Sequence, residues 1–147
     1  ATTRNPRIGE KDGVNYYFIS DERFQDMIDK KEFLEWAQFA GNYYGTPLST
    51  VNEKIEKGFI VLLEIEVEGA KQIKEKFPEA LSIFLLPPSK EELEKRIRNR
   101  GTEKEEAINT RLSRAKYEIA SSNKFDFVLT NHYVDETAKR IFKIIKS

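Results

Sequence analysis

The feature that most constrains the fold is a nearly unbroken apolar run, FIVLLEIEV, at residues 59–67. Such a run is typical of a parallel-sheet strand that is covered on both faces. Two further apolar runs follow, ALSIFLLPP and FDFVLTN, and helical patterns separate the three. Strands that alternate with helices predict an α/β protein with a parallel sheet and helices on both of its faces.

Capping signals and turn residues predict where the other elements begin and end. Ser20, followed by two acidic residues, predicts a short helix that continues to about Asp29. Residues 33–39 predict a strand, and Gly41 predicts the turn after it. Three pairs have the spacing of a capping box and predict further helix starts: Thr50 with Glu53, Ser89 with Glu92, and Thr102 with Glu105. Two glycines, Gly58 and Gly101, can end helices.

These elements divide the chain into four segments. Residues 1–58 predict a mixed lobe of helices and strands that precedes the sheet. Residues 59–87 belong to the core sheet, and residues 88–112 form an arginine-rich segment with few large apolar side chains, which suits a helical lid. Residues 113–147 return to the core.

Composition excludes several classes of protein. The 147 residues carry 25 basic and 25 acidic side chains, which argues against a general nucleic-acid binder. Without cysteine there is no disulfide framework, and the single histidine, His132, excludes a metal site built from several histidines and is interpreted as an ordinary loop residue. No apolar run approaches the ~20 residues that span a bilayer, and no signal peptide is visible. We expect no membrane partner and a cytoplasmic location.

Two arginines near the start of the chain are candidates for binding an anion. Arg4 and Arg7 flank Pro6, which keeps the backbone between them extended. Because a guanidinium group is a planar fork of donors, two of them can converge on one phosphate. Tyr16 and Tyr44 could add hydroxyl donors. The alternative is a solvated loop with two exposed arginines.

Glu35, in the strand predicted over residues 33–39, is a candidate reader of a purine base. Guanine presents N1–H and N2–H₂ side by side, and one carboxylate can accept from both, whereas adenine lacks that pair. Thr46 could add a hydroxyl toward O6 of the base. The alternative is a glutamate on the exposed face of a strand.

Glu64 and Glu66 lie two residues apart at the end of the first apolar run, so a strand would place them on one face. Ligands of open α/β sheets bind beyond the carboxyl ends of the strands. These carboxylates could orient the arginines, a nucleotide or hydrated magnesium, or they could be structural.

Three more arginines lie in and beside the predicted lid: Arg96, Arg100 and Arg111. Like charges near one another are unfavourable unless they share an anion. Arginines on a lid can stabilise the charge that develops in phosphoryl transfer. The alternative is a charged helix with internal pairs such as Glu92 with Arg96.

Taken together, these residues resemble the guanylate kinase family. The segment TTRNPRIGEKDGVNYYF, residues 2–18, matches that family's T-T-R-x-x-R-x-x-E-x-x-G-x-x-Y-x-F signature at every fixed position. The likeness continues through EFLEWAQFAGNYYGTP, LLEIEVEGAKQ, IFLLPPS and RIRNRGTEKEEAINTRL, and it covers essentially the whole chain.

The resemblance implies the fold of a P-loop nucleoside monophosphate kinase and the transfer of a phosphoryl group from ATP, with Mg²⁺, to GMP. It implies that Glu66 assists at the nucleotide, although many relatives have aspartate at positions 64 and 66. It implies that the phosphate of GMP is held by Arg4, Arg7, Tyr16 and Tyr44, and that guanine is bound by Glu35 and Thr46. It also implies that the lid and transfer site contain Arg96, Arg100 and Arg111, and that Asn131 lies near the ATP base.

The chain departs from the family in one respect. The family's ATP site begins with a strand and a G-x-x-x-x-G-K-[ST] loop, yet none of the seven glycines here is followed by lysine. We therefore expect the 147 residues alone to be inactive, and the remaining strands to expose apolar edges. Three explanations stay open: the missing segment belongs to a longer form of this chain, it belongs to another chain, or the chain binds GMP without catalysis. The retained GMP-site residues favour the first two.

Two functions follow from the sequence. The first is an enzyme, a guanylate kinase with GMP and ATP as substrates, for which this chain supplies the GMP site, the lid and part of the core. The second is a non-catalytic guanylate-kinase-like module that binds GMP or a phosphopeptide. A guanine reader at Glu35 favours the first, because a peptide binder needs none. The sequence does not predict an oligomeric state.

Overall fold

The computed structural model describes residues 1–99 and 104–147, and the chain divides into two compact units, Ala1–Ala80 and Leu81–Ser147. We describe each unit by itself. The predicted boundary at residue 58 stays a prediction. Residues on either side of it, in β1 (Phe33–Phe39) and α3 (Val67–Lys76), pack together within the first unit. None of the helices in the described part of the chain combines the length and apolar character needed to cross a membrane.

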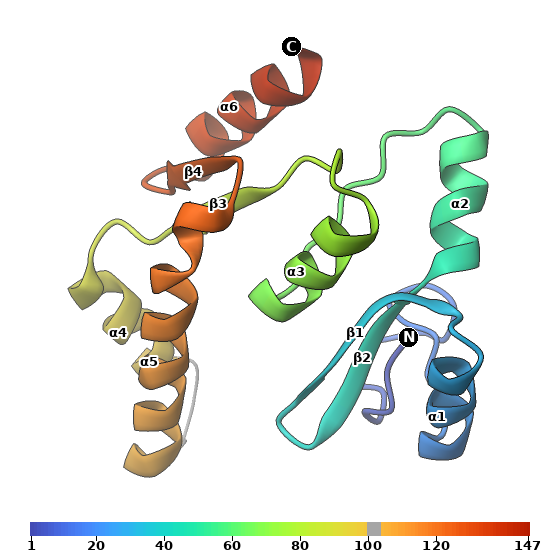
Figure 1. Ribbon diagram of the computed structural model, residues 1–147. Helices are drawn as coiled ribbons and strands as arrows, with labels where there is room; N and C mark the ends of the chain where they lie inside the picture. The colour runs from blue at the N-terminus through green and yellow to red at the C-terminus, as the bar shows by residue number, and fades with distance from the viewer. Residues whose placement is uncertain (100–103) are drawn as a thin grey trace. The chain divides into compact units, whose positions relative to one another are not determined.

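The first unit is built on an antiparallel hairpin of β1 (Phe33–Phe39) and β2 (Asn42–Pro47), which Figure 1 shows beside α1 (Asp21–Asp29). The turn between the strands contains Gly41 at φ +82°, as its sequence predicted. Ser20 is the N-cap of α1, and its hydroxyl accepts from the Arg23 N–H at 3.1 Å. The predictions of α1, β1 and the turn are confirmed.

An aromatic cluster forms the core of this unit. Phe24 of α1 is 1% exposed, and its ring centroid lies 4.4 Å from that of Phe33 and 5.2 Å from that of Tyr43. Gly45 makes this packing possible, because a β-carbon at that position would approach the Phe33 ring to 2.8 Å. The cluster holds α1 on the hairpin and so fixes the strand that carries Glu35.

The helix α2 (Leu48–Glu56) begins directly after β2, with Pro47 as its N-cap. The capping box predicted from Thr50 and Glu53 is therefore wrong, since Thr50 lies inside the helix. Proline already fixes φ near the helical value, so the chain can turn from strand to helix without a side-chain cap. Gly58, at φ +86°, follows the end of α2 as predicted.

The prediction of a buried strand over residues 59–67 is wrong. Within the described ranges these residues pair with no strand, and Phe59, Ile60 and Leu62 are 59%, 71% and 76% exposed. A parallel strand requires hydrogen-bonded neighbours, and hydrophobicity alone does not supply them. The run instead leads into α3 (Val67–Lys76).

Two side chains of α3 hold the free edge of β1. Gln72 accepts from the Trp36 N–H at 3.1 Å and donates to the Trp36 carbonyl at 2.8 Å. The Lys76 ammonium donates to the carbonyl of Leu34 at 2.8 Å. The backbone groups of a strand edge need partners when they are covered, and α3 supplies them through side chains rather than through another strand.

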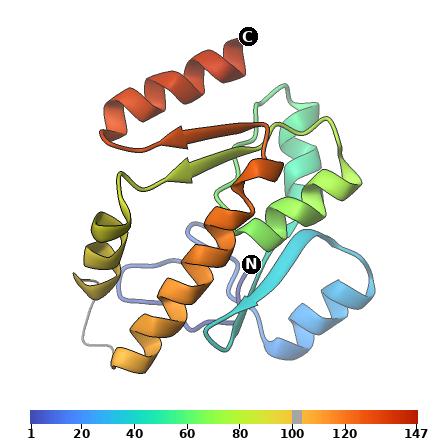
Figure 2. The same cartoon turned by 60° about the vertical axis from the view of Figure 1, so that its left-hand side comes forward.

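The second unit contains a two-stranded parallel sheet of β3 (Ile83–Leu86) and β4 (Phe127–Thr130), whose arrows point the same way in Figure 2. Its helices are α4 (Lys90–Asn99), α5 (Glu105–Ala120) and α6 (Val134–Lys146), with a short 3₁₀ turn, Ser122–Lys124, before β4. Leu129 is buried, whereas Phe127 and Val128 are 40% and 41% exposed.

The helix starts in this unit agree in part with the capping signals. The Glu92 N–H donates to the Ser89 hydroxyl at 3.0 Å at the start of α4, as predicted. The helix α5 begins after Lys104, so Glu105 opens it, while the predicted cap Thr102 and the predicted stop Gly101 lie outside the described residues. The α/β class with a parallel sheet is confirmed, and within residues 1–99 and 104–147 the parallel sheet has two strands in place of the three expected.

Candidate functional site

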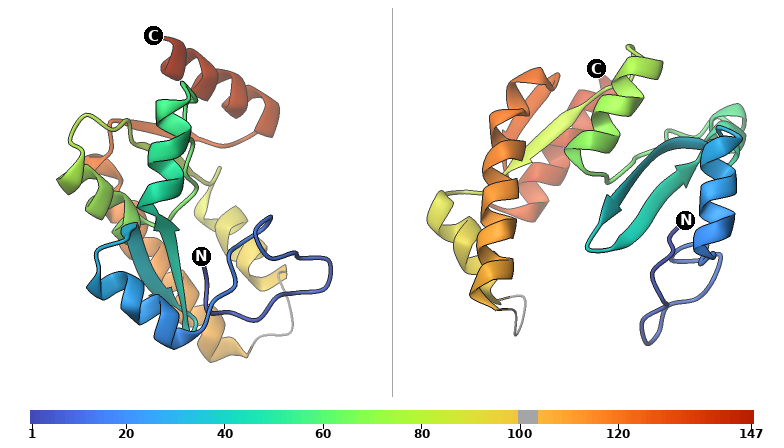
Figure 3. Two further views of the ribbon diagram at one scale, coloured as in Figure 1. Left: turned by 90° about the vertical axis from the view of Figure 1, so that its right-hand side faces the viewer. Right: turned by 60° about the horizontal axis from the view of Figure 1, so that its bottom comes forward.

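The arginine segment is anchored to the hairpin by two threonines. Thr2 is fully buried; its hydroxyl donates to the Tyr43 carbonyl at 2.8 Å and accepts from the Arg4 N–H at 3.2 Å. The Thr3 hydroxyl accepts from the Tyr43 N–H at 2.9 Å. Figure 3 shows the first residues as a long loop beside the hairpin. These bonds fix where the arginines begin, a role that the sequence did not indicate.

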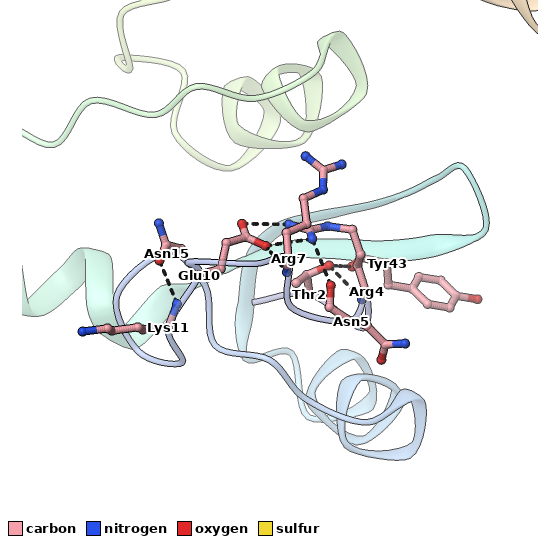
Figure 4. Close-up of polar contacts among 8 residues, drawn as sticks. All are labelled: Thr2, Arg4, Asn5, Arg7, Glu10, Lys11, Asn15 and Tyr43. Atoms are coloured by element: carbon pink, nitrogen blue, oxygen red, sulfur yellow. Dashed lines mark hydrogen bonds and ion pairs between the residues drawn. The ribbon is translucent and has the colours of Figure 1, made fainter. Parts of the chain in front are cut away.

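Arg4 is held by a carboxylate of its own loop. Its Nη1 and Nη2 donate to Oε1 and Oε2 of Glu10 at 2.9 and 3.1 Å, and Nη1 also donates to the Asn5 carbonyl at 2.9 Å (Figure 4). The hydrogen bond with Glu10 raises the pKa of Arg4. Conversely, the bond from Arg4, followed by that from the Arg7 N–H, lowers the pKa of Glu10. The sequence offered no role for Glu10 beyond its place in the signature.

Arg7 differs from Arg4 in that its side chain is exposed. Its backbone N–H donates to Glu10 Oε1 at 2.7 Å, while its guanidinium makes no hydrogen bond with any residue in the described ranges. Figure 4 shows this side chain extending away from the bonded carboxylate. One fixed and one unpaired guanidinium therefore lie on the same short loop.

Tyr16 and Tyr44 lie beside Arg4. The guanidinium carbon of Arg4 is 5.4 Å from the centre of the Tyr16 ring, and the two tyrosine rings are 6.1 Å apart in an edge arrangement. Both tyrosines are half-buried. The structure thus brings three of the four predicted phosphate-site residues into contact, and Arg7 is joined to them through Glu10.

Glu35 points into the protein rather than to solvent. It is 6% exposed, and Thr46 on the neighbouring strand donates a hydrogen bond from Oγ1 to Glu35 Oε1 at 2.6 Å. The reading of Glu35 as an exposed strand residue is therefore wrong. Because a hydroxyl has a single proton, Thr46 offers lone pairs rather than a donor to a ligand in this arrangement.

A cavity of about 210 Å³ in the first unit connects these groups. Six of the residues that line it are predicted site residues: Tyr16, Glu35, Tyr44, Thr46, Glu64 and Glu66. Within the described part of the unit, Arg4 and Arg7 lie outside this lining, although Arg4 contacts two of its tyrosines. The cavity is large enough for part of a nucleotide and combines carboxylates with hydroxyls.

Glu64 and Glu66 reach the cavity from the extended residues before α3. Glu64 is exposed and Glu66 is half-buried, and neither residue belongs to a strand. The expectation that both carboxylates lie at the end of a buried strand is therefore wrong. Glu66 is the N-cap of α3, and its carbonyl accepts from the Ala70 N–H at 3.0 Å. Their placement at the cavity follows from the start of this helix.

The predicted lid arginines lie in the second unit, apart from Arg100, which falls outside the described residues. Arg96 is exposed, and its Nε donates to Glu92 at 3.1 Å, which is the internal pair that the sequence allowed. Exposed pairs of this kind contribute little to stability and leave the side chain free to move. Arg111 is half-buried on α5.

Arg98, which the sequence did not single out, makes contacts on both helices of this segment. It donates to Glu94 at 3.0 Å and binds both oxygens of Glu105, at 2.9 and 3.0 Å. The pKa of Glu105 is lowered by this hydrogen bond, and the pKa of Arg98 is raised. Arg98 thus joins α4 to α5; the seven-residue separation of Arg98 and Glu105 crosses two helices, so helical periodicity could not reveal the pair.

Asn131 and His132 follow β4. The Asn131 side-chain oxygen accepts from the hydroxyl of buried Thr137 at 2.8 Å, and its N–H donates to the Leu86 carbonyl at 2.8 Å. His132 is exposed in the loop before α6, as expected. Asn131 is therefore fixed at the carboxyl end of the sheet, the edge where α/β proteins bind ligands.

Comparison with known proteins agrees with this architecture. The family model described as guanylate kinase matches residues 1–147. A guanylate kinase of Prochlorococcus marinus subsp. pastoris is 89% identical over 147 residues, which are 100% of this chain and 80% of that protein. One from Halalkalibacterium halodurans is 54% identical over 145 residues, 99% of this chain and 71% of its own length.

A solved structure gives the same result. The crystal structure of guanylate kinase from Anaplasma phagocytophilum matches with a TM-score of 0.82 and 37% identity, covering 99% of this chain and 71% of that one. These matches place the fold in the α/β class of nucleotide kinases. The chain belongs to the guanylate kinase family.

Proposed function

We propose that this chain carries the GMP site of an enzyme that transfers a phosphoryl group from ATP to GMP, giving ADP and GDP. The observation that carries the proposal is Glu35, a 6% exposed carboxylate held by Thr46 in the wall of the cavity. A buried carboxylate needs donors. N1–H and N2–H₂ of guanine supply two that face the same way, while adenine presents an acceptor at N1.

Thr46 supports this reading in a second way. While it donates to Glu35, its lone pairs can accept from an amino group but it cannot donate to O6. We therefore assign Thr46 the tasks of orienting Glu35 and of accepting from N2–H₂. The contact with O6 that the sequence suggested would require the bond to Glu35 to break.

The phosphate of GMP would be held by the arginine loop. Arg4 lies over the Tyr16 ring, Arg7 supplies a guanidinium that makes no hydrogen bond with the described residues, and Tyr16 and Tyr44 also line the cavity. Glu64 and Glu66, which also line the cavity, would orient the nucleotide from the other wall. Positioning the acceptor phosphate is the main contribution a kinase makes to this reaction.

The remaining predicted residues belong to the donor side. Arg96, Arg100 and Arg111 would neutralise charge on the transferred group, and Asn131 would lie near the ATP base. Among the described residues no group of three or more histidine, cysteine, aspartate or glutamate side chains could hold a metal ion. We propose that Mg²⁺ arrives with ATP, held mainly by its phosphates, and neutralises charge there.

A non-catalytic module that binds GMP is the second candidate. The contacts of Glu35 and Arg4 account for the binding of GMP whether or not catalysis follows. A phosphopeptide would use the arginines but leave Glu35 buried without a base, so we favour GMP over a phosphopeptide as the ligand.

A cytoplasmic location and substrates limited to GMP and ATP, with no nucleic acid, accord with the neutral net charge and the identity of the relatives.

Isothermal titration of the chain with GMP, AMP and guanosine tests the proposal. We expect GMP to bind more tightly than AMP, because of Glu35, and more tightly than guanosine, because of the arginines. Equal affinity for GMP and AMP would contradict the guanine site. In a coupled assay for ADP, the 147 residues alone should be silent and should gain turnover when joined to a P-loop segment of a relative; continued silence would favour the non-catalytic module.

A further inference from the structure

Glu10 makes three hydrogen bonds that none of the proposed roles explains. Both of its oxygens accept from Arg4, and Oε1 also accepts from the Arg7 N–H at 2.7 Å. The side chains of Arg4 and Glu10 are only 13% and 18% exposed, although they lie in a loop. Glu10 therefore contacts both arginines of the proposed phosphate site, one through its guanidinium and the other through its backbone (Figure 4).

The atoms involved determine which edge of Arg4 remains for a ligand. A guanidinium group has five N–H donors. Glu10 and the Asn5 carbonyl take both hydrogens of Nη1 and one of Nη2. The remaining donors, on Nε and Nη2, lie side by side on the other edge. They form a second fork, which matches two oxygens of one phosphate.

The aromatic neighbours lie with this same group. The Arg4 guanidinium lies over the Tyr16 ring at 5.4 Å, and the neighbouring Tyr44 is one of the smaller causes of the raised pKa of Arg4. Because Glu10 and Asn5 together hold three of the five donors, the group cannot rotate without losing several bonds. Its orientation is set before any ligand arrives.

We propose that Glu10 is a positioning residue of the anion site, which holds Arg4 with its free edge available to a phosphate and fixes the backbone of Arg7 so that its guanidinium can reach the same phosphate. The inference rests on the proposed function, since it concerns the phosphate half of that site. A preformed fork avoids the loss of side-chain freedom that would otherwise oppose binding.

The opposite possibility has a distinct signature. If Glu10 were an internal anion that competes with phosphate for Arg4, its removal would strengthen the binding of GMP. If Glu10 served only to stabilise the loop, its removal would lower the affinity for guanosine and for GMP equally. Positioning predicts weaker binding of GMP alone.

The variant that separates these outcomes is Glu10→Gln. Glutamine keeps one acceptor oxygen for the Arg7 N–H and loses the charge that pairs with Arg4. We expect titration to show GMP binding about tenfold weaker, as for the loss of a charged hydrogen bond, with guanosine unchanged. The control Glu79→Gln removes an exposed carboxylate of the same unit that accepts no side-chain hydrogen bond from the described residues, and it should change neither affinity.

A double-mutant cycle identifies the partner. In an Arg4→Ala background, Glu10→Gln should cause little further loss of GMP affinity, because the group that it orients is gone. A full second tenfold loss, an unchanged GMP affinity or a tighter one would overturn the inference. If the unmodified chain binds GMP no more tightly than guanosine, the proposed phosphate site itself fails, which is a separate result.

Discussion

Gly69 lies directly against the carboxylate of Glu35: a β-carbon at position 69 would come within 2.6 Å of Glu35 Oε2 and 3.2 Å of its Cδ. Gly69 is in the first turn of α3 and is buried. The closeness of helix and strand here therefore depends on the absence of a side chain. It also defines one wall of the space that the Glu35 carboxylate can occupy.

We expect Gly69→Ala to displace the Glu35 carboxylate and weaken GMP binding. Overpacking of this kind costs about 1–3 kcal/mol, so GMP affinity should fall by about 5- to 100-fold, while AMP binding, which does not use Glu35, should not change. Alanine itself favours a helix, so α3 is not weakened by its backbone preference. Titration with both nucleotides measures the effect.

The control is Gly58→Ala. Gly58 has φ +86° and open space around its Cα, so alanine there strains the backbone without touching Glu35. It should lower the free energy of unfolding and leave the preference for GMP over AMP intact. If both variants change that preference alike, the contact between Gly69 and Glu35 is not what sets it.

Replacing the carboxylate itself gives the second prediction. Glu35→Gln keeps the shape of the side chain but replaces one carboxylate oxygen with an amide NH₂ group. That NH₂ group is a donor, and it would face an N–H donor of guanine. GMP binding should weaken by ~1–3 kcal/mol, the cost of an unpaired buried group, with AMP unaffected. Glu75→Gln, an exposed change on α3, is the matched control. Unchanged affinity for GMP would remove Glu35 from the proposed site.

The elements that the sequence predicted well are those with local determinants. The start of α1 depends on Ser20 and its neighbours, and the hairpin turn depends on Gly41, so a few residues were sufficient. Glu35 and Thr46, which the sequence proposed as site residues, belong to adjoining strands and are paired in register. What failed was the run over residues 59–67, because a strand requires a neighbour that its own residues do not specify.

The contacts that position the site were not predictable in the same way. Gly69 meets Glu35 only after α3 packs on β1, and Glu10 meets Arg4 only when the loop between them closes. Both residues have ordinary interpretations when read locally, as a helix glycine and an exposed loop glutamate. Their roles depend on distances between segments, which no periodicity encodes.

The third prediction concerns the edge of β1. Gln72 satisfies both the N–H and the C=O of Trp36, so Gln72→Ala leaves two covered backbone groups without a partner. Unfolding by urea should show a loss of about 1–3 kcal/mol. Gln25→Ala on α1, which removes an exposed bond to Asp29, should change stability far less. Equal losses would mean that water replaces Gln72 at this edge.

The last prediction is a pH dependence that comes from Glu10. Its bonds with Arg4 and the Arg7 N–H lower its pKa below the ordinary 4.5. A group whose pKa is lowered on folding stabilises the folded state above its unfolded pKa, and this contribution is lost as the pH falls through the folded value. Glu10→Gln removes the group, so the stability difference between the unmodified chain and the variant should be constant at neutral pH and shrink below about pH 4.5.

Urea denaturation without ligand is the appropriate measurement for this prediction, since GMP would add the titration of its own phosphate. The control Glu79→Gln, which loses no bond to an arginine, should follow the unmodified chain across the same range. A difference that stays constant through the acid range would mean that the carboxylate of Glu10 gains nothing from Arg4 in the folded state. The preformed fork would then have to depend on Asn5 and the tyrosines instead.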